Sequence, residues 1–263
     1  MLTYKINIQD IKNQIFIPKY YDPALRQELL SLKETHDLLV LGDLIDAGII
    51  GAQTGHEIGK MAYGTGSIPF VRTSDISNWE IKTIPKQGVS QEIYDFYAYK
   101  EDVQPGDILM VKDGTYLIGT NCIVTPLDIP MIYQSHILKF RVVSSELLDP
   151  LILFLALNCP LVQRQIRNMQ FTADIIDTLG SRYREIILPI PKDITFRKEL
   201  SEKMKQALDT RIRYKAAIKQ MPLLIESVLE SGTTQAFDTF FSKPIDEVLN
   251  ELVQDTTTLE FGF

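Results

Sequence analysis

The stretch GDILMVKDG, residues 106–114, places four apolar residues between a Gly-Asp pair and a Lys-Asp-Gly turn. A short apolar run bounded by turn residues is typical of a β-strand. The same arrangement recurs between residue 38 and about residue 141, in LLVLGDLI (38–45), SIPFVRT (67–73), LIGTNCIVT (117–125) and HILKFRVV (136–143). We therefore expect a strand-and-loop domain. Its longest loop, GAQTGHEIGKMAYGTGS (51–67), holds five glycines, and long ordered loops often carry function.

Helices are expected on both sides of this region. Asp22 and Pro23 stand where an N-cap and a first helical residue belong, so a helix should run to about residue 34. A second helix should start at Asp149-Pro150, and Pro160 should kink or divide it. The segment before residue 22 is expected to be an extended arm.

A long helix is expected from about residue 195 to residue 221, after a strand ILPIP (187–191) and a capping Asp193. Apolar residues recur along it every four positions, at Leu200, Met204, Leu208 and Ile212. At 1.5 Å per residue it would be roughly 40 Å long, which suits packing against a partner helix. Pro222 should kink or end it, with helix continuing beyond, and a further helix is expected at 245–253.

The charge of the chain is unevenly distributed. The 263 residues carry a net charge of −7, which by itself argues against nucleic-acid binding. Residues 230–263 contain seven acids and one base, a net −6, so residues 1–229 carry only −1. Residues 197–219 hold eight bases and three acids, a net +5. A basic face is therefore compatible with the acidic total.

The composition also limits location and chemistry. No apolar run approaches the roughly 20 residues of a membrane span, and the start lacks a signal-peptide pattern. We expect a cytoplasmic protein with Cys122 and Cys159 as reduced thiols. No phosphate-binding loop, dinucleotide fingerprint or nucleophile elbow occurs, and the three histidines lack metal-ligand spacing. No catalytic residue, cofactor or metal is therefore expected.

Three polar segments each follow or interrupt a short apolar run. They are Arg72, Thr73, Ser74 and Asp75 with Asn78; then Lys112, Asp113, Gly114, Thr115 and Tyr116; then Gln134, Ser135 and His136. Arg, Lys, Asn and Gln reach base edges in DNA grooves, while Ser, Thr and Tyr hold phosphates. Turns and helix caps use the same residue types, so composition alone favours that structural role.

The order of these segments along the chain favours the DNA-binding interpretation instead. IPFVRTSDISN (68–78), GDILMVKDGTYLIG (106–119) and the junction of ILPIP with a long helix resemble, in this order, the target-recognition domain of type I restriction-modification specificity subunits. The same domain is found fused behind adenine-N6 DNA methylases. The resemblance covers about residues 38–221 and rests on order and spacing, since no single motif is diagnostic.

The resemblance implies an α+β fold: a compact strand-and-loop recognition domain with flanking helices, followed by a long helix that packs against a partner helix. Family members usually carry two recognition domains, whereas this chain has one. It implies four parts: an N-terminal arm and helix that docks on a partner (1–37), the recognition domain (38–193), a spacer and dimerisation helix (194–231) and an acidic tail (232–263).

The function implied is that of a non-catalytic specificity subunit. It would bind duplex DNA through the three polar segments and direct an adenine-N6 methyltransferase subunit, and in some assemblies a restriction nuclease, as a homodimer on a split, palindromic target. Asp75 and Asp113 would orient neighbouring bases or accept from a cytosine amino group. Two alternatives stay open: a metal-dependent nuclease using Asp107, Asp113 or Lys112, and an interaction scaffold without DNA binding.

Overall fold

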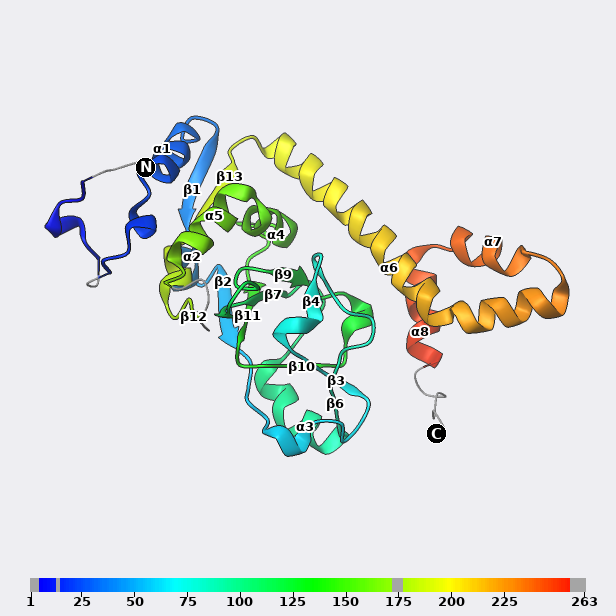
Figure 1. Ribbon diagram of the computed structural model, residues 1–263. Coiled ribbons are helices and arrows are strands. Elements are labelled where there is room, and N and C mark those ends of the chain that lie inside the picture. The colour runs from blue at the N-terminus through cyan, green and yellow to red at the C-terminus, as the bar shows by residue number, and fades with distance from the viewer. Residues whose placement is uncertain (1–4, 13–14, 172–176, 256–263) are drawn as a thin grey trace. The chain divides into compact units, whose positions relative to one another are not determined.

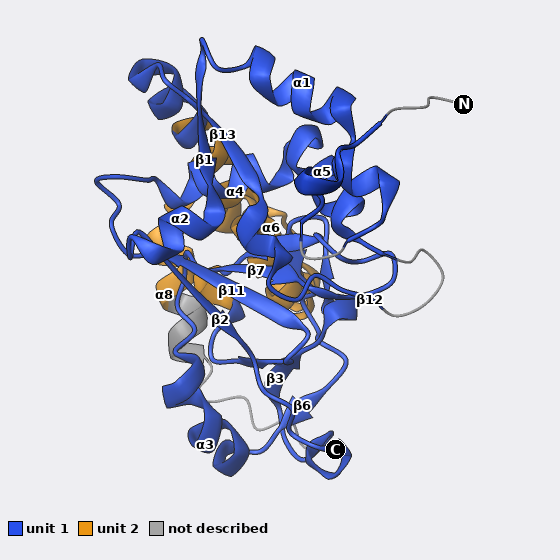
Figure 2. Ribbon diagram, turned by 90° about the vertical axis from the view of Figure 1, so that its left-hand side faces the viewer, with its two compact units in different colours: residues 1–124, 128–201 blue, residues 125–127, 202–263 orange. Residues whose placement is uncertain are grey.

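A computed structural model of the chain describes residues 5–12, 15–171 and 177–255 (Figure 1). The chain forms two compact units, coloured separately in Figure 2. The first consists of residues 1–124 and 128–201, and the second of residues 125–127 and 202–263. Strands and helices both contribute to the first unit, which confirms the α+β class.

The strands belong to the first unit. They are β1 His36–Val40, β2 Ile50–Thr54, β3 Ile68–Val71, β4 Ile76–Ser77, β5 Glu80–Ile81, β6 Gly88–Val89, β7 Ile108–Val111, β8 Asp113–Gly114, β9 Asn121–Ile123, β10 Ile132–Tyr133, β11 Ile137–Val142, β12 Asp177–Thr178 and β13 Ile187–Pro191. The helices of this unit are α1 Pro23–Ser31, α2 Leu41–Asp46, α3 Gln91–Glu101, α4 Pro150–Asn158 and α5 Pro160–Met169.

A four-stranded antiparallel sheet, in the order β2-β11-β7-β9, forms the centre of this unit. All four residues of β7 are buried, because a strand between two others and covered on both faces needs no polar side. Its last residue, Val111, pairs with Ile137, the first residue of β11. The apolar stretches 108–111, 121–123 and 137–142 are thus strands, as the sequence predicts.

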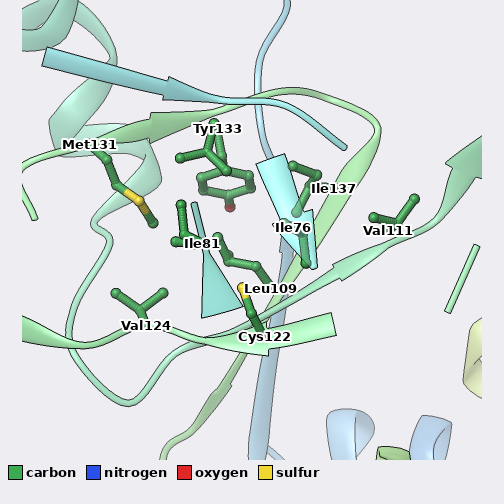
Figure 3. Close-up of a cluster of buried hydrophobic side chains, with 10 residues drawn as sticks. Ile76, Ile81, Leu109, Val111, Cys122, Val124, Met131, Tyr133 and Ile137 are labelled. Carbon is green, nitrogen blue, oxygen red and sulfur yellow. The ribbon is translucent and has the colours of Figure 1, made fainter. Parts of the chain in front are cut away.

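A smaller sheet, in the order β10-β3-β6, lies beside the first. Its strands β3 and β10 run parallel, with Val71 opposite Tyr133. One apolar cluster contains residues of both sheets and fixes them together (Figure 3). It consists of Val71, Ile76, Ile81, Leu109, Val111, Cys122, Val124, Met131, Tyr133 and Ile137.

Strands β1 and β13 pair with each other antiparallel, Val40 opposite Ile187. The prediction that the whole stretch 38–45 is strand-like was wrong for its second half, which is α2. Leu41 and Leu44 are both buried, and their three-residue spacing puts them on one helical face. A run this short does not separate a buried strand from a buried helix by its apolar residues alone.

The predicted starts of the first two helices and the division at Pro160 are confirmed, although α1 ends at Ser31 rather than at about residue 34. Asp22 accepts a hydrogen bond from the Ala24 amide (3.0 Å), and Pro23 is the first residue of α1. Asp149 caps α4 in the same way through the Leu151 amide (2.7 Å). Pro160 divides the following segment, because α4 ends at Asn158 and α5 begins at the proline itself.

The long helix α6 spans Ile194–Ser231. The Asp193 carboxylate caps it by accepting from the amides of Thr195 (2.8 Å) and Phe196 (3.1 Å). The helix continues past Pro222, and the boundary between the two compact units falls inside it, after Ser201.

In the second unit, the acidic segment folds into α7 Gln235–Ser242 and α8 Ile245–Asp255. Phe240 and Val248 of these helices are buried against Ala216 and Ala217 of α6. The tail is therefore helical up to residue 255, and residues 256–263 lie outside the described part of the chain. In the described ranges, no helix combines the length and apolar character needed to cross a membrane.

Candidate nucleic-acid interface

The first and third polar segments leave neighbouring strands at the same end. Arg72 follows β3 and Gln134 follows β10, and these strands are parallel neighbours. The Gln134 amide donates to the Val71 carbonyl at 2.9 Å, which extends the pairing by one residue. Because parallel strands end at a common edge, Arg72 and Gln134 leave the sheet side by side.

The second segment reaches the same edge through the other sheet. Lys112 follows β7, and its amide donates to the His136 carbonyl at 2.9 Å. Residues 134–136 form the turn that leads from β10 of the small sheet into β11 of the large one. This turn therefore joins the two sheets, and it brings all three polar segments together within the first unit.

Asp113 lies at the centre of a side-chain network at this edge. Its carboxylate oxygen Oδ2 is 2.8 Å from Lys112 Nζ and 3.0 Å from His136 Nδ1, and Oδ1 accepts from the Thr178 hydroxyl. Burial raises the pKa of the Asp113 carboxyl, but the hydrogen bonds from Lys112, Thr178 and His136 outweigh it and hold the pKa below its ordinary value. The carboxylate is thus kept charged and orients Lys112 and His136.

Glu57 extends this network from the Gly-rich loop. The Ser135 hydroxyl donates to Glu57 Oε1, and His136 Nε2 lies 3.7 Å from the same oxygen. Ser135 and His136 are adjacent in sequence, and on a strand their side chains would point to opposite faces. They lie in a turn, where both side chains reach the same carboxylate.

Asp75 does not belong to the exposed surface, contrary to expectation. Its side chain is fully buried, and its two carboxylate oxygens accept from the amides of Arg72 (3.0 Å) and Lys86 (3.3 Å). The carboxylate therefore fixes the turn after β3 and has no access to a base. The neighbouring Arg72 guanidinium lies over the Tyr63 ring, 5.7 Å from its centroid.

The other predicted contact residues are at the surface or partly buried. Tyr116 is 86% exposed, just beyond Gly114, whose φ of 143° requires glycine. Ser74 is exposed, whereas Thr73 and Thr115 are half-buried. Gln134 is only 8% exposed. It therefore contributes to this edge through its backbone more than through its side chain.

Asn78 occupies a separate position. It forms the β4–β5 turn with Trp79, and both residues have positive φ, 50° and 69°. Trp79 forms a bridge with Cys122 of β9, and Cys122 is the register partner of Leu109. Since Leu109 lies three residues before Lys112, Asn78 is displaced along the sheet by about 10 Å from the network.

Asp107 and Asp113 do not form an acid pair. They stand at opposite ends of β7, about 20 Å apart for six extended residues. Asp107 is 1% exposed and is bound by Arg141 Nε and Nη2, both at 2.7 Å. In the described part of the chain, no three His, Cys, Asp or Glu side chains are grouped to hold a metal ion. The paired acids named for the nuclease alternative are therefore not formed by Asp107 and Asp113.

A buried carboxylate lies beneath the edge. Glu101, at the end of α3, is fully buried and accepts from the Tyr133 amide at 2.8 Å, while His56 Nδ1 lies 2.9 Å from its Oε1. Burial raises the pKa of Glu101, and the hydrogen bonds from His56 and Tyr133 only partly offset this. No local pattern in the sequence indicates this pair, because His56 and Glu101 are 45 residues apart.

No protein-family model matches the sequence, and no curated protein matches it. Its structural neighbours belong to type I restriction-modification systems. One is a chain from a structural study of complex assembly and conformational transition in the type I restriction-modification system. It has 14% sequence identity and a TM-score of 0.43, and the match covers 83% of this chain and 53% of that one. The HsdS subunit of Thermoanaerobacter tengcongensis has 14% sequence identity and a TM-score of 0.42. The match covers 83% of this chain and 51% of that subunit.

The S subunit of M. genitalium gives 15% identity and a TM-score of 0.46, with 80% of this chain and 49% of that one covered. The chain thus spans about half the length of these neighbours. At such identities and TM-scores, the likeness by itself does not indicate a shared function.

Proposed function

We propose that this chain is a DNA-recognition subunit that binds a specific duplex sequence and directs an adenine-N6 DNA methyltransferase subunit, and in some assemblies a restriction nuclease, to it. On this proposal the chain breaks no bond itself and needs no cofactor. The observation that carries the proposal is the convergence of Arg72, Lys112 and the 134–136 turn at one edge of two adjoining sheets.

The chemistry of this edge suits duplex DNA. Arg and Lys side chains contact phosphates or the acceptor edge of guanine, and Ser, Thr and Tyr hydroxyls contact phosphates. The three segments are short loops, and each is held at its base by strand pairing or by a bond such as Lys112 N to His136 O. Binding residues on loops that a rigid scaffold positions are the usual arrangement for recognition.

The overall acidity of the chain does not oppose this function. The segment 230–263 carries a net −6 of the total −7, and its described part folds within the second unit. The recognition edge belongs to the first unit. What matters for approach to a polyanion is the potential at the contacting surface rather than the total charge.

The long helix supports pairing with a second copy. Five apolar residues of α6 follow a 4-3-4-3 spacing and are exposed or half-exposed: Tyr214, Ile218, Met221, Ile225 and Val228. This spacing is the repeat of a coiled-coil seam. We call these five residues the α6 seam, and we include in the proposal that two copies pair along it and recognise a split, palindromic target.

The test is binding by the full chain, co-purified with an adenine-N6 methyltransferase subunit. We expect one two-part sequence to be bound about 10³-fold more tightly than random duplex, with affinity falling steeply as salt rises. Methylated adenines should map to that sequence. Magnesium-dependent cleavage by the chain alone, or equal binding to all duplexes, would replace this proposal with the nuclease or the scaffold.

A further inference from the structure

The Gly-rich loop is attached firmly to the recognition edge at its first residues. A side chain at Gly55 would overlap the carbonyl oxygens of Tyr133 and Gln134, so glycine is needed for the close approach of the two backbones. The next residue, His56, bridges to Gln134 and donates its amide to the Tyr133 carbonyl at 3.1 Å.

The His56 side chain adds a second attachment from below. Its ring nitrogen lies 2.9 Å from the carboxylate of Glu101, which is fully buried and also accepts from the Tyr133 amide. His56 is thus fixed through both backbone and side chain. The backbone of Glu57, one residue further along, is therefore held in place. A selective contact requires a residue that is positioned in this way.

The Glu57 carboxylate is held on one side and open on the other. Ser135 and His136 both approach the same oxygen, Oε1. Within the ranges that the structure describes, no group donates to Oε2, and the side chain is 55% exposed. Asp113, by contrast, is 13% exposed and paired with Lys112 at 2.8 Å. Glu57 is therefore the carboxylate of this network that can meet a ligand.

A carboxylate at a DNA-binding edge has two opposite effects. It repels phosphates and so weakens binding to every sequence. It also accepts a hydrogen bond from the exocyclic amino group of cytosine. Adenine offers an amino group too, but its acceptor N7 lies beside that group and repels the carboxylate, whereas guanine N7 and O6 and thymine O4 offer only acceptors in the major groove. One carboxylate therefore lowers the affinity for all sequences and restores affinity only where a base donates to it.

We infer that Glu57 is a specificity-determining residue, which reads a cytosine amino group in the target through its exposed oxygen. Ser135 is its positioning residue, because the hydroxyl holds the carboxylate in place. The inference rests on the proposed function and deepens it by naming a base contact outside the three polar segments.

The experiment is selection of bound sequences from a random-duplex library by the full chain, comparing wild type with Glu57→Ala, Ser135→Ala and Glu34→Ala. Glu34 is an exposed acid between α1 and β1, so its variant loses the same charge away from the edge. We expect Glu57→Ala to lose the cytosine preference at one position, by about tenfold, and to bind random duplex more tightly. Ser135→Ala should weaken the same preference while keeping the charge.

The outcomes separate the two proposals. If wild type selects a sequence and Glu57→Ala selects the same one with undiminished preference at every position, the role of Glu57 is wrong and DNA recognition stands. If wild type selects no sequence, DNA recognition itself is overturned. If Glu34→Ala changes the selected sequence as much as Glu57→Ala does, the effect is one of charge and the base contact is refuted.

Discussion

The Asp107 carboxylate is bound by Arg141 through two nitrogens, Nε and Nη2, each at 2.7 Å. Asp107 precedes β7 and Arg141 lies in β11, so the pair joins two neighbouring strands of the central sheet. Lys139 Nζ is 3.8 Å from the same carboxylate, and burial lowers the pKa of this lysine. The pair thus locks the end of the sheet opposite to the recognition edge.

Replacing Arg141 by alanine should destabilise the first unit strongly. The change would leave the Asp107 carboxylate, which is 1% exposed, without its main partner. Lys139 and the Gln104 amide then compensate the charge only in part, and removing the main partner of a buried carboxylate costs about 3 kcal/mol in free energy of unfolding. Urea denaturation measures this value. Arg164→Ala is the matched control, because its pair with Glu28 is at the surface and should contribute less than about 1 kcal/mol; equal losses would contradict the assignment.

Glu101 should make stability depend on pH. Burial raises its pKa above the ordinary 4.5, despite the opposing hydrogen bonds from His56 and Tyr133. The folded state therefore binds the proton more tightly than the unfolded state does. The stabilisation from this group is complete below pH 4.5 and is lost as pH rises through the folded pKa.

Glu101→Gln keeps the shape of the side chain and removes its titration. The free energy of unfolding of this variant, relative to wild type, should therefore increase as pH rises above about 4.5, and the increase should end once pH has passed the raised pKa of Glu101. Urea denaturation at a series of pH values measures the difference. Glu34→Gln changes an exposed carboxyl instead, and its difference from wild type should stay nearly constant. A flat difference for Glu101→Gln would show that its carboxyl is not shifted.

The sequence was sufficient to predict strands and helix starts where these depend on neighbouring residues alone. The apolar run 108–111 and the proline-bounded 187–191 are strands, and Asp149 and Asp193 cap helices. These features depend on propensity and caps within a few residues. Prediction failed at α2, because buried Leu41 and Leu44 fit both a strand and a helix.

The candidate site was predictable only in part. The polar segments were visible as residue types, but Asp75 and Asp113 cannot be separated by type. One is fully buried and caps a turn, and the other joins Lys112 and His136. Glu57 was missed because its contact with Ser135 spans 78 residues. Such pairings follow from tertiary packing and leave no local pattern.

Alanine at both Arg72 and Lys112 should weaken DNA binding. Both side chains lie at the recognition edge, where Lys112 is also paired with Asp113 at 2.8 Å, and each substitution removes one phosphate or base contact. We expect affinity for the selected target to fall at least about tenfold, and the dependence of log affinity on log salt to become shallower by about one per lost phosphate contact. Fluorescence anisotropy over a salt series measures both quantities.

Arg26→Ala with Lys33→Ala is the matched control for this pair. Both residues are exposed and lie in or just after α1, outside the recognition edge. The control also removes one arginine and one lysine charge. It should therefore change affinity only through the overall electrostatic potential of the molecule. If the control and the Arg72/Lys112 variant lose affinity equally, the edge has no special role.

Ile218→Asp and Ile225→Asp should abolish self-association of the chain. Both residues belong to the α6 seam, are 43% and 47% exposed, and would be buried when two copies pair. A charge at a buried seam position is left without a partner and destabilises the paired helices. Sedimentation equilibrium should give a dimer for wild type and a monomer for either variant.

Leu223→Asp is the matched control, because this residue is also exposed (60%) but lies outside the seam spacing. It should leave the dimer intact. A monomeric wild type, or dissociation caused equally by Leu223→Asp, would exclude pairing along the seam, and the split palindromic target would then lose its structural basis.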